Sequence, residues 1–253
     1  MARQKLGQHF LIRGSVLERI ARAACGERVP LVVEIGPGWG ALTTHLLARA
    51  GRVIAVEIDR DLAERLAQKH ADDPRLEIVP GDALKIGLGQ WGPATFAGNL
   101  PYYAATAILE RVVALGPLMQ RGVFLTQKEV AERIVASPGS RAYGYLSVVM
   151  QLSAEVELLF DVPPAAFHPP PKVDSAVVRF VPRDRAAELG IADRQDLLRF
   201  VALCFRQKRK ILRNNLAARY GARIDAWPEV MVRAEQTGIP EFAAIYRRLV
   251  TYR

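Results

Sequence analysis

The chain has 253 residues, 50% hydrophobic and 24% charged, a globular composition that allows one large domain or one domain with a small appendage. Its net charge of +9 favours a polyanionic partner, most simply a nucleic acid, although an anionic membrane surface or a merely basic enzyme fits the charge as well. Because no apolar run reaches the roughly 18 residues of a membrane span and the N-terminal MARQKLGQHF lacks a signal-peptide core, we expect a cytoplasmic protein without a membrane partner.

The predicted elements of the first half alternate between strands and helices. An amphipathic helix is expected over 15–24, with Ser15 as its N-cap. After this helix, strands are predicted at 31–40, 52–59, 76–84, 94–103 and 121–127, and helices at 41–50, 60–72, 104–115 and 128–137. Short apolar strands that alternate with helices predict an α/β fold, with a mostly parallel sheet covered by helices on both faces.

The second half begins with two further predicted strands, 147–162 and 175–182, joined by the proline-rich segment 163–174. A polar linker over 182–196 then leads to a helical tail. We therefore predict two domains, 1–181 and 182–253, the second small, basic and α-helical.

A basic stripe is expected on one helix of this tail. Arg206, Lys210 and Arg213 are spaced i, i+4 and i+7 and would share one face. Such a stripe neutralises phosphates, so it favours docking on structured RNA, although a solvated basic face is the plainer alternative. The apolar residues assigned to the core here are Leu197, Val201, Cys204, Ile211 and Leu216.

A glycine-rich loop closes the first predicted strand. Gly36, Gly38 and Ala41 fit the GxGxxG/A pattern of nucleotide-binding turns, in which the backbone approaches the ligand closely. Glu57 ends the next strand about twenty residues on, where a carboxylate accepts hydrogen bonds from ribose hydroxyls. These two features fit either a nicotinamide cofactor or S-adenosylmethionine, and a purely structural turn is the alternative.

Two further features favour S-adenosylmethionine. The pattern from Glu34 to Gly40 resembles motif I of class I methyltransferases. Asp82 ends the third strand, where it would accept a hydrogen bond from the adenine amine of the cofactor, with Ile58 and Ala83 as apolar walls. An N-cap or turn residue is the plainer interpretation of Asp82.

The segment 96–109, FAGNLPYYAATAIL, ends an apolar strand in an asparagine, a proline and two tyrosines. The carboxyl edge of such a sheet is where ligands bind. The Asn99 side-chain oxygen and the Leu100 carbonyl would accept hydrogen bonds from an exocyclic adenine amine, which is otherwise a poor nucleophile. Pro101 would rigidify this turn and Tyr102 would stack on the base.

Seven separated motifs carry a specific resemblance. They are KLGQHFL (5–11), EIGPGWGALT (34–43), VEID (56–59), GDAL (81–84), NLPYYAATAIL (99–109), FHPPPKVDSAVVRF (167–180) and FRQKRKILRNNL (205–216). Together they resemble the rRNA adenine N6,N6-dimethyltransferase family, in its bacterial small-subunit branch, over nearly the whole chain. The resemblance implies a Rossmann-like class I fold with a small C-terminal helical domain. It also implies transfer of two methyl groups from S-adenosylmethionine to N6 of each of two adjacent adenosines, in a loop near the 3′ end of 16S rRNA, during small-subunit biogenesis.

Combined with the residue patterns, the resemblance indicates roles for individual residues. Asn99, Leu100, Pro101 and Tyr102 would hold the target adenine, with Phe167 as a second stacking partner. Expected cofactor contacts are Gln8, His9, Leu11, Gly36, Gly38, Glu57, Ile58, Asp82, Ala83 and Asn99. Expected RNA contacts are Lys172, Arg206, Lys208, Arg209, Lys210 and Arg213. Two departures stand out: His9 replaces the more usual asparagine, and AATAIL replaces a Ser/Thr-containing run.

Four other functions compete with this hypothesis. A 23S rRNA dimethyltransferase of the macrolide-resistance type shares the fold and site, and a DNA adenine methyltransferase commonly carries a Pro-Pro-Tyr motif instead. A ribosome-assembly or transcription factor could retain the fold without catalysis, and a nicotinamide dehydrogenase fits only the glycine loop. The partner expected here is small-subunit rRNA in the assembling 30S particle. Two cysteines and four histidines without ligand spacing indicate neither disulfide nor metal, and we expect a monomer.

Overall fold

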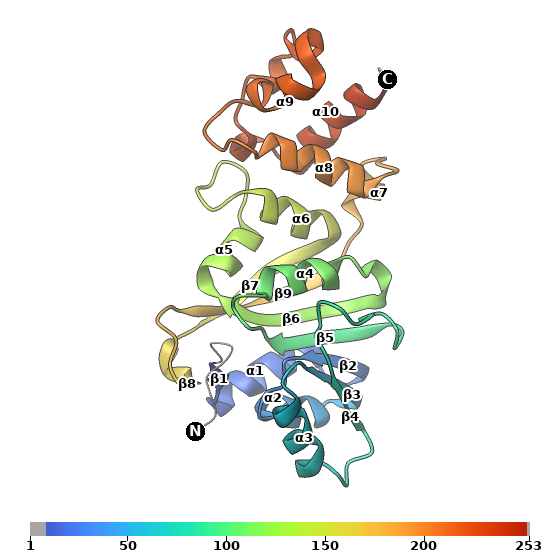
Figure 1. Ribbon diagram of the computed structural model, residues 1–253, viewed down its shortest axis with the longest axis vertical. Coiled ribbons are helices and arrows are strands. Elements are labelled where there is room, and N and C mark those ends of the chain that lie inside the picture. Colours follow the sequence, from blue (N-terminus) through green and yellow to red (C-terminus); the bar gives the residue numbers. More distant parts are fainter. Residues whose placement is uncertain (1–8, 252–253) are drawn as a thin grey trace. The chain divides into compact units, whose positions relative to one another are not determined.

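The computed structural model describes residues 9–251, so Gln8, one of the expected cofactor contacts, lies outside the described residues. The chain forms two compact units (Figure 1). The larger comprises the residues up to Ala131 together with Glu155–Pro182, and the smaller comprises Glu132–Ala154 and everything from Arg183 onward. The predicted division at 181 and 182 therefore has a counterpart at Pro182, but the helical unit also includes 132–154, which the sequence analysis assigned to the first domain.

The larger unit is built on a mixed seven-stranded sheet with the strand order β4-β3-β2-β5-β6-β9-β7. The first five of these strands pair in parallel, and β6 pairs with β9 in antiparallel fashion. This confirms the predicted α/β class and the mostly parallel sheet. Their bounds are β2 Val29–Ile35, β3 Ala50–Glu57, β4 Leu76–Pro80, β5 Ala94–Asn99, β6 Met119–Gln127, β7 Ala154–Val162 and β9 Ser175–Pro182.

Helices cover both faces of this sheet. The first, α1 (Gly14–Cys25), packs on β5, β6 and β9, whereas α4 (Ala105–Val113) contacts β6 from the other side (Figure 1). The apolar stripe of α1 is fully buried, as a 3.6-residue period requires. The helix begins after Arg13 without a side-chain cap, so the predicted cap at Ser15 was wrong. The other elements of this region are α2 Ala41–Leu47, α3 Arg60–Lys69, η1 Gly116–Leu118 and η2 Pro164–Ala166. The helix α5 (Lys128–Val135) begins in the larger unit and ends in the smaller one.

A two-stranded ribbon lies outside the main sheet. In it β1 (Phe10–Leu11) pairs antiparallel with β8 (Phe167–His168), so that Leu11 faces Phe167 in register. The amide of Ile12 extends the pairing by donating to the Ala166 carbonyl at 2.9 Å. This ribbon ties the start of the described chain to the proline-rich loop.

The smaller unit is helical and has its own hydrophobic core. Buried aromatic side chains such as Phe200 and Phe242 pack there with Leu152, Val201 and Leu216. Leu152 belongs to the 132–154 segment, which explains why that segment joins this unit. Its elements are α6 Tyr145–Ser153, α7 Arg185–Glu188, α8 Arg194–Cys204, α9 Leu212–Tyr220, η3 Gly221–Ile224, η4 Pro228–Val230, η5 Ala234–Gln236 and α10 Ile239–Thr251. Among residues 9–251, no helix is long and apolar enough to cross a membrane.

One predicted strand is largely a helix. Residues 147–153, expected to begin a strand, belong to α6, and only 154–162 are extended. The run is apolar without alternation because nearly every residue of α6 is buried, so periodicity could not separate helix from strand. Tertiary hydrogen bonds hold the helix: Gln151 Nε2 donates to the carbonyls of Ile134 at 2.9 Å and Ala136 at 2.8 Å.

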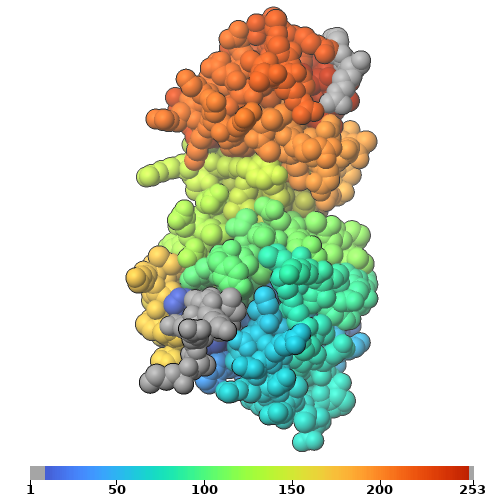
Figure 2. All heavy atoms as spheres, in the orientation of Figure 1, coloured from blue at the N-terminus to red at the C-terminus, as the bar shows by residue number. Residues whose placement is uncertain are grey.

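The predicted basic helix is also wrong. Arg206 and Lys210 lie in a turn between α8 and α9, and only Arg213 is helical. We call residues 206–210 the basic turn; its side chains are exposed, and it forms part of the outer surface of this unit (orange in Figure 2). The buried amide of Asn215 fixes the turn, because it accepts from Gln207 N at 3.0 Å and donates to the carbonyls of Cys204 at 2.9 Å and Gln207 at 3.2 Å. These bonds replace the helical ones that would have continued α8.

Candidate active site

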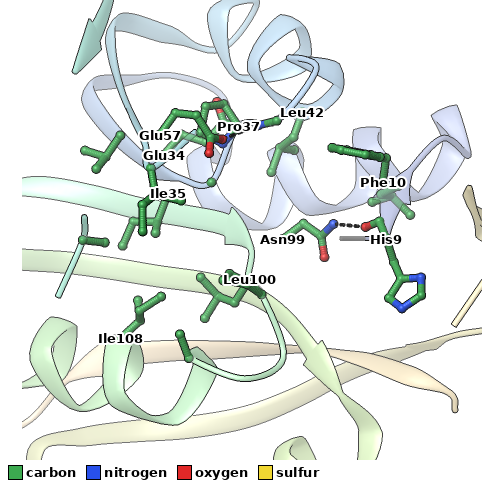
Figure 3. Close-up of a pocket in the computed structure, with 18 of the residues that line it drawn as sticks. His9, Phe10, Glu34, Ile35, Pro37, Leu42, Glu57, Asn99, Leu100 and Ile108 are labelled. Atoms are coloured by element: carbon green, nitrogen blue, oxygen red, sulfur yellow. Dashed lines mark hydrogen bonds between the residues drawn. The ribbon is translucent and has the colours of Figure 1, made fainter. Parts of the chain in front are cut away.

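A cavity of about 320 Å³ lies in the larger unit at the carboxyl ends of β4, β3, β2 and β5. Adjacent parallel strands bring their C-terminal residues to one edge, so residues distant in sequence converge there. Ile35, Glu57 and Asn99 end three of these strands and all line the cavity (Figure 3). Most of the lining is apolar and a few polar side chains are among it, which is the usual character of a small-molecule site.

The glycine loop is held in place by Glu57. Gly36, Gly38 and Gly40 all have positive φ, between 56° and 78°, a backbone conformation that favours glycine. The Gly38 amide donates to Glu57 Oε2 at 2.9 Å, and the Asp59 amide donates to Oε1 at 3.0 Å. Burial raises the pKa of Glu57, which these amide bonds oppose. Each carboxylate oxygen can accept a second hydrogen bond, so Glu57 can position the loop and still bind a ligand hydroxyl.

Beneath the loop, Glu34 is almost completely buried. Its carboxyl accepts a hydrogen bond of 2.6 Å from the Thr43 hydroxyl. Burial raises the pKa of Glu34 to about 8, the Thr43 bond opposes this, and the nearby Glu57 charge adds to it. Glu34 is therefore mostly protonated near neutral pH.

This burial predicts a pH-dependent stability. A carboxyl whose folded pKa of about 8 exceeds its usual 4.5 stabilises the fold fully below pH 4.5, and this contribution is lost as pH rises towards 8. In denaturant unfolding at pH 5 to 8, Glu34→Gln should therefore gain stability relative to wild type as pH rises. The exposed Glu64→Gln control should run parallel to wild type, and a parallel curve for Glu34→Gln would contradict the assignment.

The asparagine at the end of β5 is oriented by the N-terminal segment. Asn99 Nδ2 donates to the His9 carbonyl at 3.0 Å, so its side-chain oxygen points away from this contact (Figure 3). The His9 ring bonds through Nδ1 to the Pro169 carbonyl at 2.8 Å, and since a carbonyl only accepts, Nδ1 carries the proton. His9 thus orients Asn99 through its backbone and is itself held by the proline-rich loop.

Tyr102, three residues after Asn99, is anchored through its hydroxyl. The hydroxyl lies 2.7 Å from Ser175 Oγ, at the start of β9. The His9 ring lies beside it, with ring centroids 5.7 Å apart and planes 31° apart. Burial raises the pKa of Tyr102, so this phenol remains protonated at neutral pH. A tyrosine whose hydroxyl is bonded and whose ring lies beside another offers a fixed aromatic surface.

The structure brings most of the predicted residues to this one cavity. The four at the end of β5, Asn99, Leu100, Pro101 and Tyr102, all line it. Asp82 lines it too, while its Oδ1 accepts the Leu84 amide at 2.8 Å, so it also serves as a turn residue. The predicted cofactor contacts that line the cavity are His9, Leu11, Gly36, Gly38, Glu57, Ile58, Asp82, Ala83 and Asn99.

Phe167 is an exception. Its side chain is only 3% exposed and packs in the core of the larger unit, and among the described residues it is not part of the cavity lining. In a strand, successive side chains face opposite ways, so the neighbouring His168 is the one that reaches the cavity. The predicted stacking surface of Phe167 is thus covered in this structure. Lys172 is exposed on the same proline-rich loop.

Several residues that line the cavity were not among the predicted site residues, including the aromatic Trp39 and Tyr103 and the imidazole of His168. Each of these three adjoins a residue that was predicted. Trp39 lies inside the glycine loop and Tyr103 follows Tyr102, so their aromatic character next to a binding motif was the available signal. No group of three or more histidine, cysteine, aspartate or glutamate side chains within 9–251 is arranged to hold a metal ion.

Solved structures with a similar fold include a dimethyladenosine transferase from Plasmodium falciparum, with a TM-score of 0.82, 23% identity and coverage of 96% of this chain and 98% of that chain. The 23S rRNA methyltransferase ErmE aligns with a TM-score of 0.72 and 28% identity, and the alignment covers 95% of this chain and 99% of that chain. Both alignments extend over the sheet and the helical unit.

Sequence relatives are closer. The chain is 42% identical to the ribosomal RNA small subunit methyltransferase A of Acidobacterium capsulatum, over 97% of this chain and 90% of that protein. It is 43% identical to the protein of the same name from Bordetella avium, over 95% of this chain and 92% of that protein. The family described as ribosomal RNA adenine dimethylase matches residues 1–240. With the glycine loop, Glu57 and the Asn-Leu-Pro-Tyr turn in one cavity, these matches show that the chain belongs to the ribosomal RNA adenine dimethylase family.

Proposed function

We propose that this protein transfers methyl groups from S-adenosylmethionine to N6 of two adjacent adenosines, in a loop near the 3′ end of small-subunit (16S) rRNA, yielding N6,N6-dimethyladenosine. The observation that carries the proposal is the convergence of Asn99, Leu100 and Tyr102 with the glycine loop and Glu57 in one cavity. The substrate is proposed as part of the assembling small ribosomal subunit, which makes the cytoplasm the proposed compartment.

The cavity fits S-adenosylmethionine in its polar groups and its walls. Glu57 would accept the ribose hydroxyls, Asp82 would accept the adenine amine, and Ile58 and Ala83 would flank the ring. Gly36 lines the cavity and, as a glycine, carries no side chain there, so a ligand could approach its backbone closely. When bound, S-adenosylmethionine supplies a methyl group made electrophilic by its sulfonium.

The protein's contribution to the reaction is mainly positioning. An adenine amine is a poor nucleophile because its lone pair is delocalised into the ring. The Asn99 oxygen and the Leu100 carbonyl would accept its two hydrogens and favour a pyramidal nitrogen whose lone pair is directed at the methyl group. The His9 carbonyl fixes this orientation by accepting Asn99 Nδ2 at 3.0 Å. A strong base is unnecessary, since the nitrogen becomes acidic once it is alkylated.

Tyr102 would provide the stacking surface for the target base. Its bond to Ser175 restricts the ring before substrate arrives, so little entropy is lost on binding. The exposed Lys172 on the proline-rich loop would contact the phosphates nearby.

The basic turn is proposed as the RNA-docking element of the helical unit. Its exposed cations are Arg206, Lys208, Arg209 and Lys210, and Lys208 Nζ also donates to the Arg141 carbonyl at 3.3 Å. Arg213 contributes less freely, because it pairs with Asp225 at 2.9 Å. Several cations on a fixed turn would neutralise phosphates and make RNA binding salt-dependent.

A test of this element uses two neighbouring asparagines. Asn215→Ala removes the three hydrogen bonds that fix the basic turn, so we expect RNA affinity to fall about fivefold and stability by roughly 1–3 kcal/mol. Asn214→Ala, an exposed neighbour on α9, is the matched control. Filter binding of small-subunit rRNA at several salt concentrations gives the comparison. Unchanged affinity in folded Asn215→Ala would exclude the turn from docking.

Large-subunit methylation is the closest competing function, given the similarity to ErmE at 28% identity. The greater identity of 42% and 43% to proteins named for the small subunit supports our proposal instead. Two assays separate these functions. Radiolabel from S-adenosylmethionine should enter unmodified small subunits but not large ones, and expression in a macrolide-sensitive strain should leave it sensitive. Label in large subunits together with macrolide resistance would overturn the proposed substrate.

A further inference from the structure

Two aromatic side chains at the cavity stand out by their exposure. Trp39 and Tyr103 are each 64% exposed, yet both line the cavity. Neither contributes its ring to the hydrophobic core, and neither has a role in the reaction as described above. Large aromatic surfaces left open to water beside a binding site indicate contact with a ligand.

The two rings come from equivalent positions on neighbouring loops. Trp39 is the third residue of a turn closed by Gly40 N donating to the Pro37 carbonyl at 2.9 Å. Tyr103 is the third residue of a turn closed by Ala104 N donating to the Pro101 carbonyl at 3.0 Å. These turns follow β2 and β5, which pair in parallel. A Cβ added at Gly36 would lie 3.6 Å from the Asn99 carbonyl, so the residues that lead into the two turns lie close together.

The Trp39 ring packs on a neighbouring ring, and the turn that carries Tyr103 is restrained. Trp39 packs edge-on against Phe10, with ring centroids 5.4 Å apart and planes 60° apart. Tyr103 follows Pro101 and the anchored Tyr102, so its turn is restrained at the Ser175 contact. Surfaces fixed before binding lose little entropy when a ligand stacks on them.

The nature of the substrate identifies what these rings would meet. A target adenosine inside the cavity leaves the nucleotides on either side at its mouth. Unpaired RNA bases are bound by stacking on aromatic side chains, whichever base is present. The excess of positive charge on the chain suits the phosphates of the same strand.

We propose that Trp39 and Tyr103 form an aromatic rim on which the unpaired bases flanking the target adenosine stack. This inference rests on the proposed function and extends it to the neighbouring nucleotides. The rim positions the RNA strand, whereas Asn99 and Leu100 act on the reacting amine. Its effect should therefore fall mainly on the KM for RNA.

The test compares variants of each ring in methylation of unmodified small subunits. Trp39→Leu and Tyr103→Leu keep apolar bulk but lose stacking, so the KM for subunits should rise about tenfold in each, with kcat changed less. Trp39→Phe and Tyr103→Phe keep a ring and should stay within about threefold of wild type. Met231→Ala, an exposed apolar residue of the helical unit, is the control.

A second readout locates the contact. Ultraviolet cross-linking of the wild-type chain to small subunits, followed by mass spectrometry, should join Trp39 or Tyr103 to nucleotides flanking the methylated adenosines. The leucine variants should lose these cross-links. Cross-links confined to other residues, together with an unchanged KM, would overturn the rim while leaving the proposed function intact.

Two other outcomes would also overturn the inference. An equal loss of S-adenosylmethionine affinity, measured by calorimetry, would assign the rings to the cofactor site. Self-association of the wild-type chain that the leucine variants abolish would assign them to a contact between copies. Failure of the wild-type chain to methylate small subunits would instead overturn the substrate on which the inference rests.

Discussion

Replacing Asn99 by alanine should lower the methylation rate of small subunits by about 10²–10³-fold at saturating cofactor. The variant loses the oxygen that would orient the adenine amine to be methylated, and it loses the hydrogen bond from Asn99 Nδ2 to the His9 carbonyl. Single-turnover rates with labelled S-adenosylmethionine measure the effect on the transfer step. Calorimetry with the same cofactor checks that the cavity still binds it.

Two controls sharpen this prediction. Asn214→Ala, exposed on α9, should retain the wild-type rate. Asn99→Asp keeps an acceptor oxygen but cannot donate to the His9 carbonyl, so its rate should lie between those of wild type and Asn99→Ala. If Asn99→Ala kept a rate within twofold of wild type, the orienting role of this side chain would be excluded.

The second large effect is expected at Gly98, in the strand that presents Asn99. A Cβ there would lie 2.4 Å from the Ile35 carbonyl of β2, a backbone atom that cannot move without displacing the strand. Gly98→Ala should therefore destabilise the protein by about 3 kcal/mol, since overpacking of this kind is not relieved by side-chain rotation. Thermal unfolding should show a Tm lower by about 6–12 °C.

Gly87→Ala, at a glycine outside the strand, is the matched control for this substitution. Nothing lies within 4 Å of a Cβ at Gly87 and its φ is not positive, so its stability should stay within about 0.5 kcal/mol of wild type. A Gly98→Ala variant as stable as Gly87→Ala would show that β2 and β5 can separate at this point. The close approach of the two strands would then not be what positions Asn99.

The convergence of Glu57 and Asn99 in one cavity was predictable because both residues end strands of the sheet. Glu57 and Asn99 were recognised from short motifs after apolar runs, and the parallel sheet brings such ends to one edge. The partners that orient them were not predictable. The bonds from Gly38 to Glu57 and from Asn99 to the His9 carbonyl depend on how separate loops meet.

The errors came from segments whose conformation depends on distant residues. The run 147–153 is buried nearly all round, so its helix leaves no periodic pattern and is held by Gln151 reaching the 134–136 backbone. The basic segment has helical spacing but forms a turn, because the Asn215 amide hydrogen-bonds to the Gln207 backbone. Phe167 carries a plausible stacking ring, but pairing of its strand with Phe10–Leu11 turns that ring into the core.

The central claim is that this cavity methylates N6 of adenosines in small-subunit rRNA, and nucleoside mass spectrometry tests it most directly. Purified protein and S-adenosylmethionine are incubated with small subunits from a strain that lacks the modification, with large subunits in parallel. Our account predicts N6,N6-dimethyladenosine in the small-subunit RNA at two adjacent positions and none in the large-subunit RNA. Dimethyladenosine only in large-subunit RNA, or no product while the cofactor still binds, would contradict it.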